Sequence, residues 1–137
     1  MADSVRVRKE ILKDMLAHAR REPDIECCGL LAGSDGVITA LFPATNALAS
    51  ATTYEIAPRE LFDLFRTLRD RKLTHFGHYH SHLSTENAPS PTDIEQAGYP
   101  DHTYFIVSLR VDAPNPIRAF SIRDGFVREL EIVAMNS

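Results

Sequence analysis

The segment Gly77-His78-Tyr79-His80-Ser81-His82 contains the side chains best suited to chemistry. In a β-strand every second side chain lies on the same face, so His80 and His82 would present two imidazoles to one ion. Asp93 follows after ten residues, which gives the chain room to leave the strand and begin a helix. Two imidazoles and one carboxylate, with a fourth position left for water, form a ligand set that Zn²⁺ occupies in hydrolases. The spacing therefore predicts that His80, His82 and Asp93 hold one zinc ion per chain.

Asp93 lies in a segment with the features of a helix start. Ser90 is a good N-cap residue, Pro91 suits the first helical position, and Asp93 follows the cap by three residues. The same letters also form a capping box, in which both side chains would bond only to the helix backbone. Taken alone, the segment favours the capping box. The His-x-His pair upstream favours the metal ligand, because three ligand-type side chains would converge where a strand ends and a helix begins.

His78 also shares a face with His80 and His82, so alternation alone permits a site of three histidines. Residues at i, i+2 and i+4 of one strand span about 13 Å of backbone, which is too long for one ion. We therefore expect His78 to be a core residue or to make a hydrogen bond outside the ligand set. His75 and His102 are expected to be structural or surface residues.

The pattern His80-Ser81-His82, then Pro89-Ser90 and Asp93, resembles the JAMM motif of the MPN-domain metalloproteases. The family pattern also has a glutamate upstream, and Glu26 in Glu26-Cys27-Cys28-Gly29-Leu30-Leu31-Ala32-Gly33 is similar to the stand-alone prokaryotic members. The segments 99–109 and 118–120 also look like the family, so the resemblance covers nearly the whole chain. One departure is Leu83, where the family usually has proline; no ligand is lost, but the following loop is less constrained.

The resemblance implies a fold, a chemistry and a substrate class. The fold would be a curved mixed β-sheet flanked by helices. Glu26 would be the general acid/base that moves protons between water and the departing amine, and Ser90 would donate its hydroxyl to the oxyanion. The substrate would be the C-terminal Gly-Gly tail of a ubiquitin-like or sulfur-carrier protein of the ThiS/MoaD kind. Ubiquitin-cleaving relatives carry a long insertion after the aspartate, whereas only nine residues separate Asp93 from Thr103 here, which favours a compact sulfur carrier.

Composition agrees with one globular domain over residues 1–137, with 44% hydrophobic and 25% charged residues. A net charge of -4 and a pI near 5.8 give no basic surface for nucleic acid or anionic membranes. The two cysteines, Cys27 and Cys28, are adjacent, so a disulfide between them is not expected. The polar N-terminus and the lack of a long apolar run predict a soluble cytoplasmic protein. The oligomeric state is not readable from the sequence.

Hydrophobic periodicity predicts helices alternating with strands, hence an α/β or mixed α+β class. A helix is expected over 8–22, ended by Pro23, a second from Pro58 and a third from Ser90. Strands are expected over 26–32, 37–42, 54–56, 74–82, 103–109, 117–122 and 126–133, with a loop over 43–53 that shapes a substrate channel.

Four other functions are alternatives to a zinc-dependent protease of this kind. A metal-free MPN interaction module would usually lack a ligand, whereas all five motif residues are present. A metallohydrolase of small-molecule amides uses the same ligands and stays open. A thiol protease would need Cys27 or Cys28 beside an electropositive group, and neither has one in sequence. Zinc deaminases need a Pro-Cys-x-x-Cys motif that is missing.

Overall fold

The computed structural model describes residues 3–136, which form seven strands and three helices. Among these residues the order along the chain is β1 (Ser4–Arg8), α1 (Lys9–Arg21), β2 (Cys28–Ser34), β3 (Val37–Ala44), α2 (Pro58–Asp70), β4 (Thr74–His82), α3 (Pro91–Gln96), β5 (Thr103–Ser108), β6 (Ile117–Arg123) and β7 (Phe126–Met135). The mixed α+β class predicted from the sequence is confirmed.

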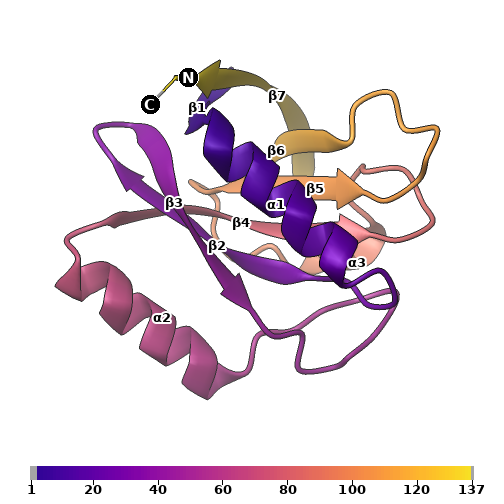
Figure 1. The fold of residues 1–137 in the computed structure, drawn as a ribbon, viewed down its shortest axis with the longest axis horizontal. Coiled ribbons are helices and arrows are strands. Elements are labelled where there is room, and N and C mark those ends of the chain that lie inside the picture. The colour runs from indigo at the N-terminus through magenta and orange to yellow at the C-terminus, as the bar shows by residue number, and fades with distance from the viewer. Residues whose placement is uncertain (1–2, 137) are drawn as a thin grey trace.

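The strands form a closed barrel in the order β1-β3-β2-β4-β5-β6-β7. β1 closes it by pairing in parallel with both β3 and β7, so the first and last strands lie side by side (Figure 1). No strand is predicted before the first helix, so the closing of the barrel by β1 is not expected from the sequence. The alternation of Val5 and Val7 with arginines was the available signal, and Val7 is fully buried in the core.

The helices differ in how deeply they pack. Figure 1 shows α1 lying across the strands, where Ile11, Met15 and Ala19 enter the core at the spacing of successive helical turns. α2 lies beside β4 and fully buries only Leu68. β4 lies between β2, which is antiparallel to it, and β5, which is parallel. His80 and His82 are therefore carried by a strand that is paired on both sides.

The strand predicted for residues 54–56 is wrong. This segment has no strand pairing and is held by Asn46 instead: the backbone N–H of Glu55 donates to Asn46 Oδ1, and Ala47 donates to the carbonyl of Glu55. A side-chain amide takes the place of a neighbouring strand, because Asn can satisfy backbone groups in a loop. The side chain of Glu55 is exposed.

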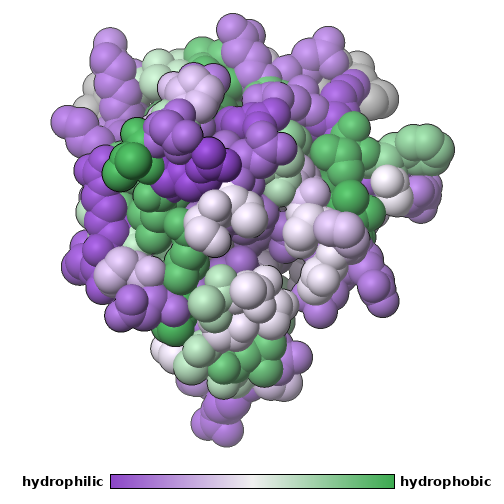
Figure 2. Space-filling view, turned by 90° about the vertical axis from the view of Figure 1, so that its right-hand side faces the viewer, coloured by the Kyte–Doolittle hydropathy of each residue, from purple (hydrophilic) through white to green (hydrophobic). Residues whose placement is uncertain are grey.

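The surface carries hydrophobic side chains in separate places. On the face in Figure 2, hydrophilic residues predominate and the hydrophobic areas form several distinct patches. The exposed large apolar side chains of the described residues come from different elements and loops: Leu48, Phe62, Tyr99, Val111, Phe126 and Val127. Within residues 3–136, none of the helices has the length and hydropathy that crossing a membrane requires.

Candidate active site

Alternation along β4 sends neighbouring side chains to opposite faces, as the sequence analysis predicts. Tyr79 is fully buried in the core, where its hydroxyl lies 2.6 Å from Nδ1 of His18. His80 and His82 lie on the other face and are 2% and 5% exposed. Ser81 Oγ accepts a hydrogen bond from the backbone N–H of Cys27 at 2.9 Å. This bond and the strand pairing fix the end of β4 against the chain that precedes β2.

The structure brings His80, His82 and Asp93 together. Nε2 of His80 lies 3.2 Å from Nε2 of His82, and the two carboxylate oxygens of Asp93 lie 3.2 Å from His80 Nε2 and 3.1 Å from His82 Nε2. Tetrahedral ligands at zinc bond lengths would be about 3.3 Å apart. The nitrogen and oxygen atoms of these three side chains therefore have separations close to those of zinc ligands.

The tautomer of His82 also suits metal binding. Its Nδ1 lies 2.9 Å from the carbonyl oxygen of Glu86, to which it can donate. In the neutral ring this bond would leave a lone pair on Nε2, on the side of His80 and Asp93, for a metal ion; a backbone acceptor behind a ligating histidine is common in metal sites. The ring of Tyr54 stacks on His80, with ring centroids 4.7 Å apart. Both imidazoles are thus held in orientation by groups outside the ligand set.

Asp93 is at once a capping residue and a member of this cluster. Ser90 Oγ accepts from the backbone N–H of Asp93 at 3.1 Å, and Asp93 Oδ2 accepts from the backbone N–H of Ser90 at 2.9 Å. The capping box is therefore present, and it leaves the Asp93 carboxylate beside the two histidines. Burial alone would raise the pKa of the Asp93 carboxyl, but hydrogen bonds from His80 and His82 hold that pKa well below its usual range. Asp93 is a carboxylate at neutral pH.

Glu26 lies just before β2, beside the end of β4. Because Cys28 pairs with His80 in an antiparallel register, Glu26 lies next to His82. Its side chain is 4% exposed, and Oε1 is buried without a hydrogen-bond partner in the described part of the chain. Burial raises the pKa of Glu26 to about 7, an effect that His82 opposes. A buried carboxylate oxygen without a partner is costly, and a water molecule at the cluster is the partner that the position suits.

Comparison with known proteins places the chain in a family. Residues 8–123 match the prokaryotic homologs of the JAB domain. The chain belongs to this family. It is 38% identical over 125 residues to a CysO-cysteine peptidase from Mycobacterium tuberculosis, covering 90% of this chain and 86% of that protein. It is 35% identical over 101 residues to a desampylase from Haloferax volcanii, covering 69% of this chain and 73% of that protein.

Solved structures agree with this assignment. A protein from Desulfitobacterium hafniense superposes with a TM-score of 0.86 at 31% identity, covering 97% of this chain and 94% of that one. A JAB1/MPN domain protein from Archaeoglobus fulgidus shares the fold, with a TM-score of 0.63 at 24% identity over 96% and 99% of the two chains. The predicted MPN fold and family are confirmed, and this JAB-family chain is a JAMM-type peptidase or isopeptidase.

Ser90 lies on the rim of the candidate JAMM site. Its Oγ is already an acceptor in the helix cap, so its hydroxyl proton stays free to be donated to another group. The backbone of Glu26 is also held: its N–H donates to the carbonyl of Ser50, and its own carbonyl accepts from Asn46 Nδ2 at 3.0 Å. Ser90 and Glu26 thus adjoin the cluster of His80, His82 and Asp93, Ser90 through its bonds to Asp93, and Glu26 through its register with His82.

Residues that were not predicted from the sequence help to position the candidate site. Asn46 is buried and bridges Glu26 to the loop, with its Nδ2 also near the carbonyls of Ser50 and Thr53. Tyr54 covers His80. An asparagine in a loop of small polar residues is a signal for side-chain to backbone bonding, but nothing local connects it to a glutamate twenty residues earlier.

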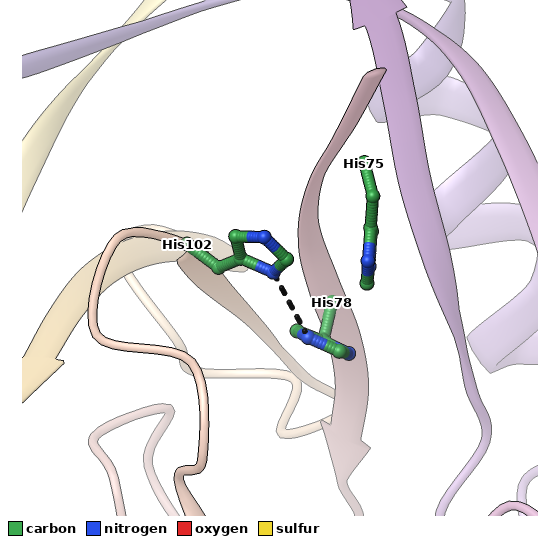
Figure 3. Close-up of side chains that lie close together, drawn as sticks. All are labelled: His75, His78 and His102. Atoms are coloured by element: carbon green, nitrogen blue, oxygen red, sulfur yellow. Dashed lines mark hydrogen bonds between the residues drawn. The ribbon is translucent and has the colours of Figure 1, made fainter. Parts of the chain in front are cut away.

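His78 lies outside the cluster, as the strand-length argument predicts. It is buried, and its Nε2 lies 3.4 Å from Nδ1 of His102 (Figure 3). His75, which also comes from β4, completes a second group of three histidines. The two cysteines have free buried thiols, and burial raises the pKa of Cys27 to about 11 and of Cys28 to about 12. Neither thiol is a nucleophile near neutral pH, which disfavours a thiol protease.

Proposed function

We propose that residues 1–137 form one JAMM domain, a zinc-dependent hydrolase that cleaves the amide bond after the C-terminal Gly-Gly tail of a ubiquitin-like or sulfur-carrier protein. The observation that carries the proposal is the position of Glu26. Among the residues that the structure describes, its buried Oε1 has no hydrogen-bond partner, and it lies beside three side chains with zinc-ligand spacing. A structural glutamate would have its oxygens paired or solvated.

His80, His82 and Asp93 would hold the zinc ion through Nε2, Nε2 and a carboxylate oxygen. The donor set supports zinc, because two imidazoles and a carboxylate with an open fourth position are typical of catalytic sites for that metal. When bound, zinc is a Lewis acid that lowers the pKa of a water molecule to about 7 and polarises a carbonyl group.

Glu26 would take the proton from the attacking water and return it to the departing amine nitrogen. Its pKa of about 7 suits both transfers, since a general acid/base works best when its pKa is near the operating pH. Ser90 would donate its hydroxyl proton to the substrate oxygen as negative charge develops there. The capping bond from Asp93 to Ser90 Oγ would hold that hydroxyl in place.

A groove beside the cluster supports an extended peptide tail as substrate. It has a volume of about 410 Å³ and is lined by Tyr54, Gln96, Tyr99, Tyr104 and further residues of the loop before α2. Tyr54, Gln96 and Tyr104 also line the hollow that contains His80 and Asp93. A tail lying in the groove would thus reach the ligands, and close walls would favour glycine because any side chain adds bulk.

The relatives support a protein tail as substrate. One is named for a peptidase acting on a CysO-cysteine conjugate, and the other is named a desampylase. The short connection between α3 and β5, residues 97–102, favours a compact carrier of the sulfur-carrier kind. Release of an amino acid from the carrier's C-terminus is the most specific version of the proposal.

The test is a cleavage assay with purified carriers. Sulfur-carrier proteins ending in Gly-Gly plus a one-residue or peptide extension are incubated with the zinc-loaded protein, and masses are followed by mass spectrometry. We expect loss of the extension after the second glycine with the wild type and no loss with Glu26→Gln. An extension that stays on every carrier would contradict the proposal.

The same assay separates the alternatives. A protein that binds no zinc and cleaves nothing would be the metal-free interaction module. A protein that binds zinc and cleaves short Gly-Gly amides as fast as whole carriers would be a small-molecule amidase.

A further inference from the structure

A second group of histidines lies at the other end of β4 from the candidate catalytic cluster. His75 and His78 come from β4, and His102 comes from the turn just before β5 (Figure 3). One ring nitrogen of each lies within 4.8 Å of one ring nitrogen of each of the others. The proposed hydrolysis uses none of these three rings.

One pair of nitrogens in this group has the spacing of metal ligands, and the third ring lies close to both. His78 Nε2 and His102 Nδ1 lie 3.4 Å apart, close to the separation of about 3.3 Å that tetrahedral zinc bonds require. The rings of His75 and His102 have centroids 4.3 Å apart, and those of His75 and His78 have centroids 4.8 Å apart. The three rings therefore lie close together, and Figure 3 shows those of His78 and His102 directed toward one another, with that of His75 beside β4.

The rings are held in place by their surroundings. Tyr99 stacks on His102 with centroids 4.7 Å apart and an angle of 4° between the rings. Tyr104 stacks on His78 at 5.3 Å, and the Tyr104 hydroxyl accepts a hydrogen bond from the backbone of Tyr99. His75 Nε2 lies 3.1 Å from the carbonyl of Gly77, to which it can donate. Such preorganisation lowers the entropy cost of assembling a ligand set.

The ligand types in this group favour certain metal ions. A neutral imidazole has one ring nitrogen with a lone pair to give, and in His75 this is Nδ1 when Nε2 donates to the carbonyl of Gly77. The nearest acidic residue in sequence, Asp101, is paired with Arg123 at 2.6 Å. A set of neutral imidazoles without carboxylates suits zinc, copper or nickel rather than calcium or magnesium.

We propose that His75, His78 and His102 form a second site for a divalent transition metal, Zn²⁺ in the first instance, separate from the proposed catalytic ion. The ion would tie β4 to the turn before β5. His78 and Tyr99 also line the groove proposed for the substrate tail. An ion at the second site would therefore fix one wall of that groove. It would not use His80, His82 or Asp93, which stay available for the catalytic ion.

The inference is tested by counting metal ions. Protein stripped with a chelator is titrated with Zn²⁺ alone and followed by calorimetry, native mass spectrometry and elemental analysis. We expect two zinc ions per wild-type chain. His75→Phe and His102→Phe keep an aromatic ring in the cluster but remove a ligand, and each should retain one ion, with affinity at the second site lower by more than about 100-fold.

Matched variants assign each ion to its site. Tyr99→Phe alters the same cluster without removing a ligand and should bind two ions. His80→Ala should bind one, because it spares the second site. Each variant's thermal unfolding without metal identifies any that fail to fold. Nitrogen-15 NMR of the wild-type histidines gives an independent readout. The ring-nitrogen signals of His75, His78 and His102 should shift together as one of the two equivalents of zinc is added.

One zinc ion per wild-type chain, unchanged in His75→Phe and His102→Phe, would overturn the inference. So would a second equivalent that leaves the NMR signals of these three rings unmoved. Neither result touches the proposed hydrolase, which depends on His80, His82 and Asp93. Conversely, a chain that binds two ions and cleaves no carrier would keep the second site and contradict the proposed function.

Discussion

Glu26 is buried, its pKa is raised, and one of its oxygens has no hydrogen-bond partner within residues 3–136. Such a combination is rare in proteins and is typical of functional sites. It lies beside His82, so the arrangement places a proton acceptor next to the candidate metal ligands. The catalytic hypothesis therefore depends on this carboxylate as a proton carrier and not as a ligand.

Replacing Glu26 with Gln separates these two roles. The amide keeps the shape of the side chain but cannot accept and return a proton. We expect turnover of a carrier substrate to fall by about 10² to 10⁴ with zinc content unchanged, as measured by product mass spectrometry and elemental analysis. A variant that loses zinc together with activity would instead make Glu26 a ligand.

Ser90 has two roles that different substitutions separate. Ser90→Ala removes both the cap and the donor, so we expect a loss of about 1 kcal/mol in stability and of about 10² to 10³ in turnover. Ser90→Gly is the control, because glycine at an N-cap costs only a few tenths of a kcal/mol. Urea unfolding and steady-state kinetics are the measurements. If Ser90→Gly regained most of the activity, Ser90 would act through the helix cap alone.

The buried thiols give a prediction about reactivity. The pKa values of Cys27 and Cys28 are raised to about 11 and about 12, so the reactive thiolate is below about 0.1% of either group at pH 8. We expect the native protein to resist iodoacetamide at pH 8 and to keep full activity. The urea-unfolded chain should be alkylated at both positions. Rapid alkylation of either cysteine in the folded protein, with loss of turnover, would instead support a thiol protease.

At the scale of elements, β2 and β4 must lie close together for Glu26 to reach His82. Gly29 of β2 faces the ring of Tyr79, and a Cβ built there would lie 2.4 Å from Tyr79 Cε1 and 2.6 Å from the carbonyl oxygen of Phe42. The Tyr79 ring cannot easily withdraw, because its hydroxyl is bonded to His18 in the core. The pairing of β2 with β4 that positions the site thus depends on the absence of a side chain at Gly29.

Gly29→Ala should therefore lower the free energy of unfolding by about 1 to 3 kcal/mol through overpacking, as measured by urea unfolding. Gly98→Ala is the matched control. A Cβ at Gly98 meets no atom within 4 Å, so the change should stay within about 0.5 kcal/mol. Equal stability of the two variants would contradict the packing described for β2 and β4.

Much of this architecture could be predicted from periodicity. The apolar stripes of α1 and α2, the motif strand β4 and the hairpin β6–β7 all carry local patterns, and the structure has them near the predicted bounds. The candidate ligands His80, His82 and Asp93 follow from motif spacing, whereas Glu26 and the role of Ser90 follow from the family resemblance. What could not be predicted depends on contacts distant in sequence: the pairing of β1 with β7, the role of Asn46 in replacing a strand at Tyr54–Ile56, and the meeting of His102 with His75 and His78.

At the scale of the whole molecule, the candidate metal cluster joins β4 to α3, two elements that the chain connects through a loop. An ion that binds the native state and not the unfolded chain stabilises the fold by mass action. At a free zinc concentration about 100 times Kd, the gain is about 2.7 kcal/mol. This gain would appear as a higher melting temperature of the whole barrel.

We therefore expect zinc to raise the melting temperature of chelator-treated protein by several degrees. The test uses the His102→Phe background, which removes the contribution of the second histidine group. Adding His80→Ala to this background should abolish the shift, as measured by differential scanning calorimetry. A shift that survives in the double variant would place the stabilising ion elsewhere.

The most direct test of the central claim is anomalous diffraction at the zinc absorption edge from a crystal of the zinc-loaded protein. The account predicts a peak about 2.0 to 2.2 Å from Nε2 of His80, Nε2 of His82 and a carboxylate oxygen of Asp93, with Glu26 beside it and not bound to it. Absence of a peak between these three side chains, or a peak whose ligands include Glu26, would contradict it.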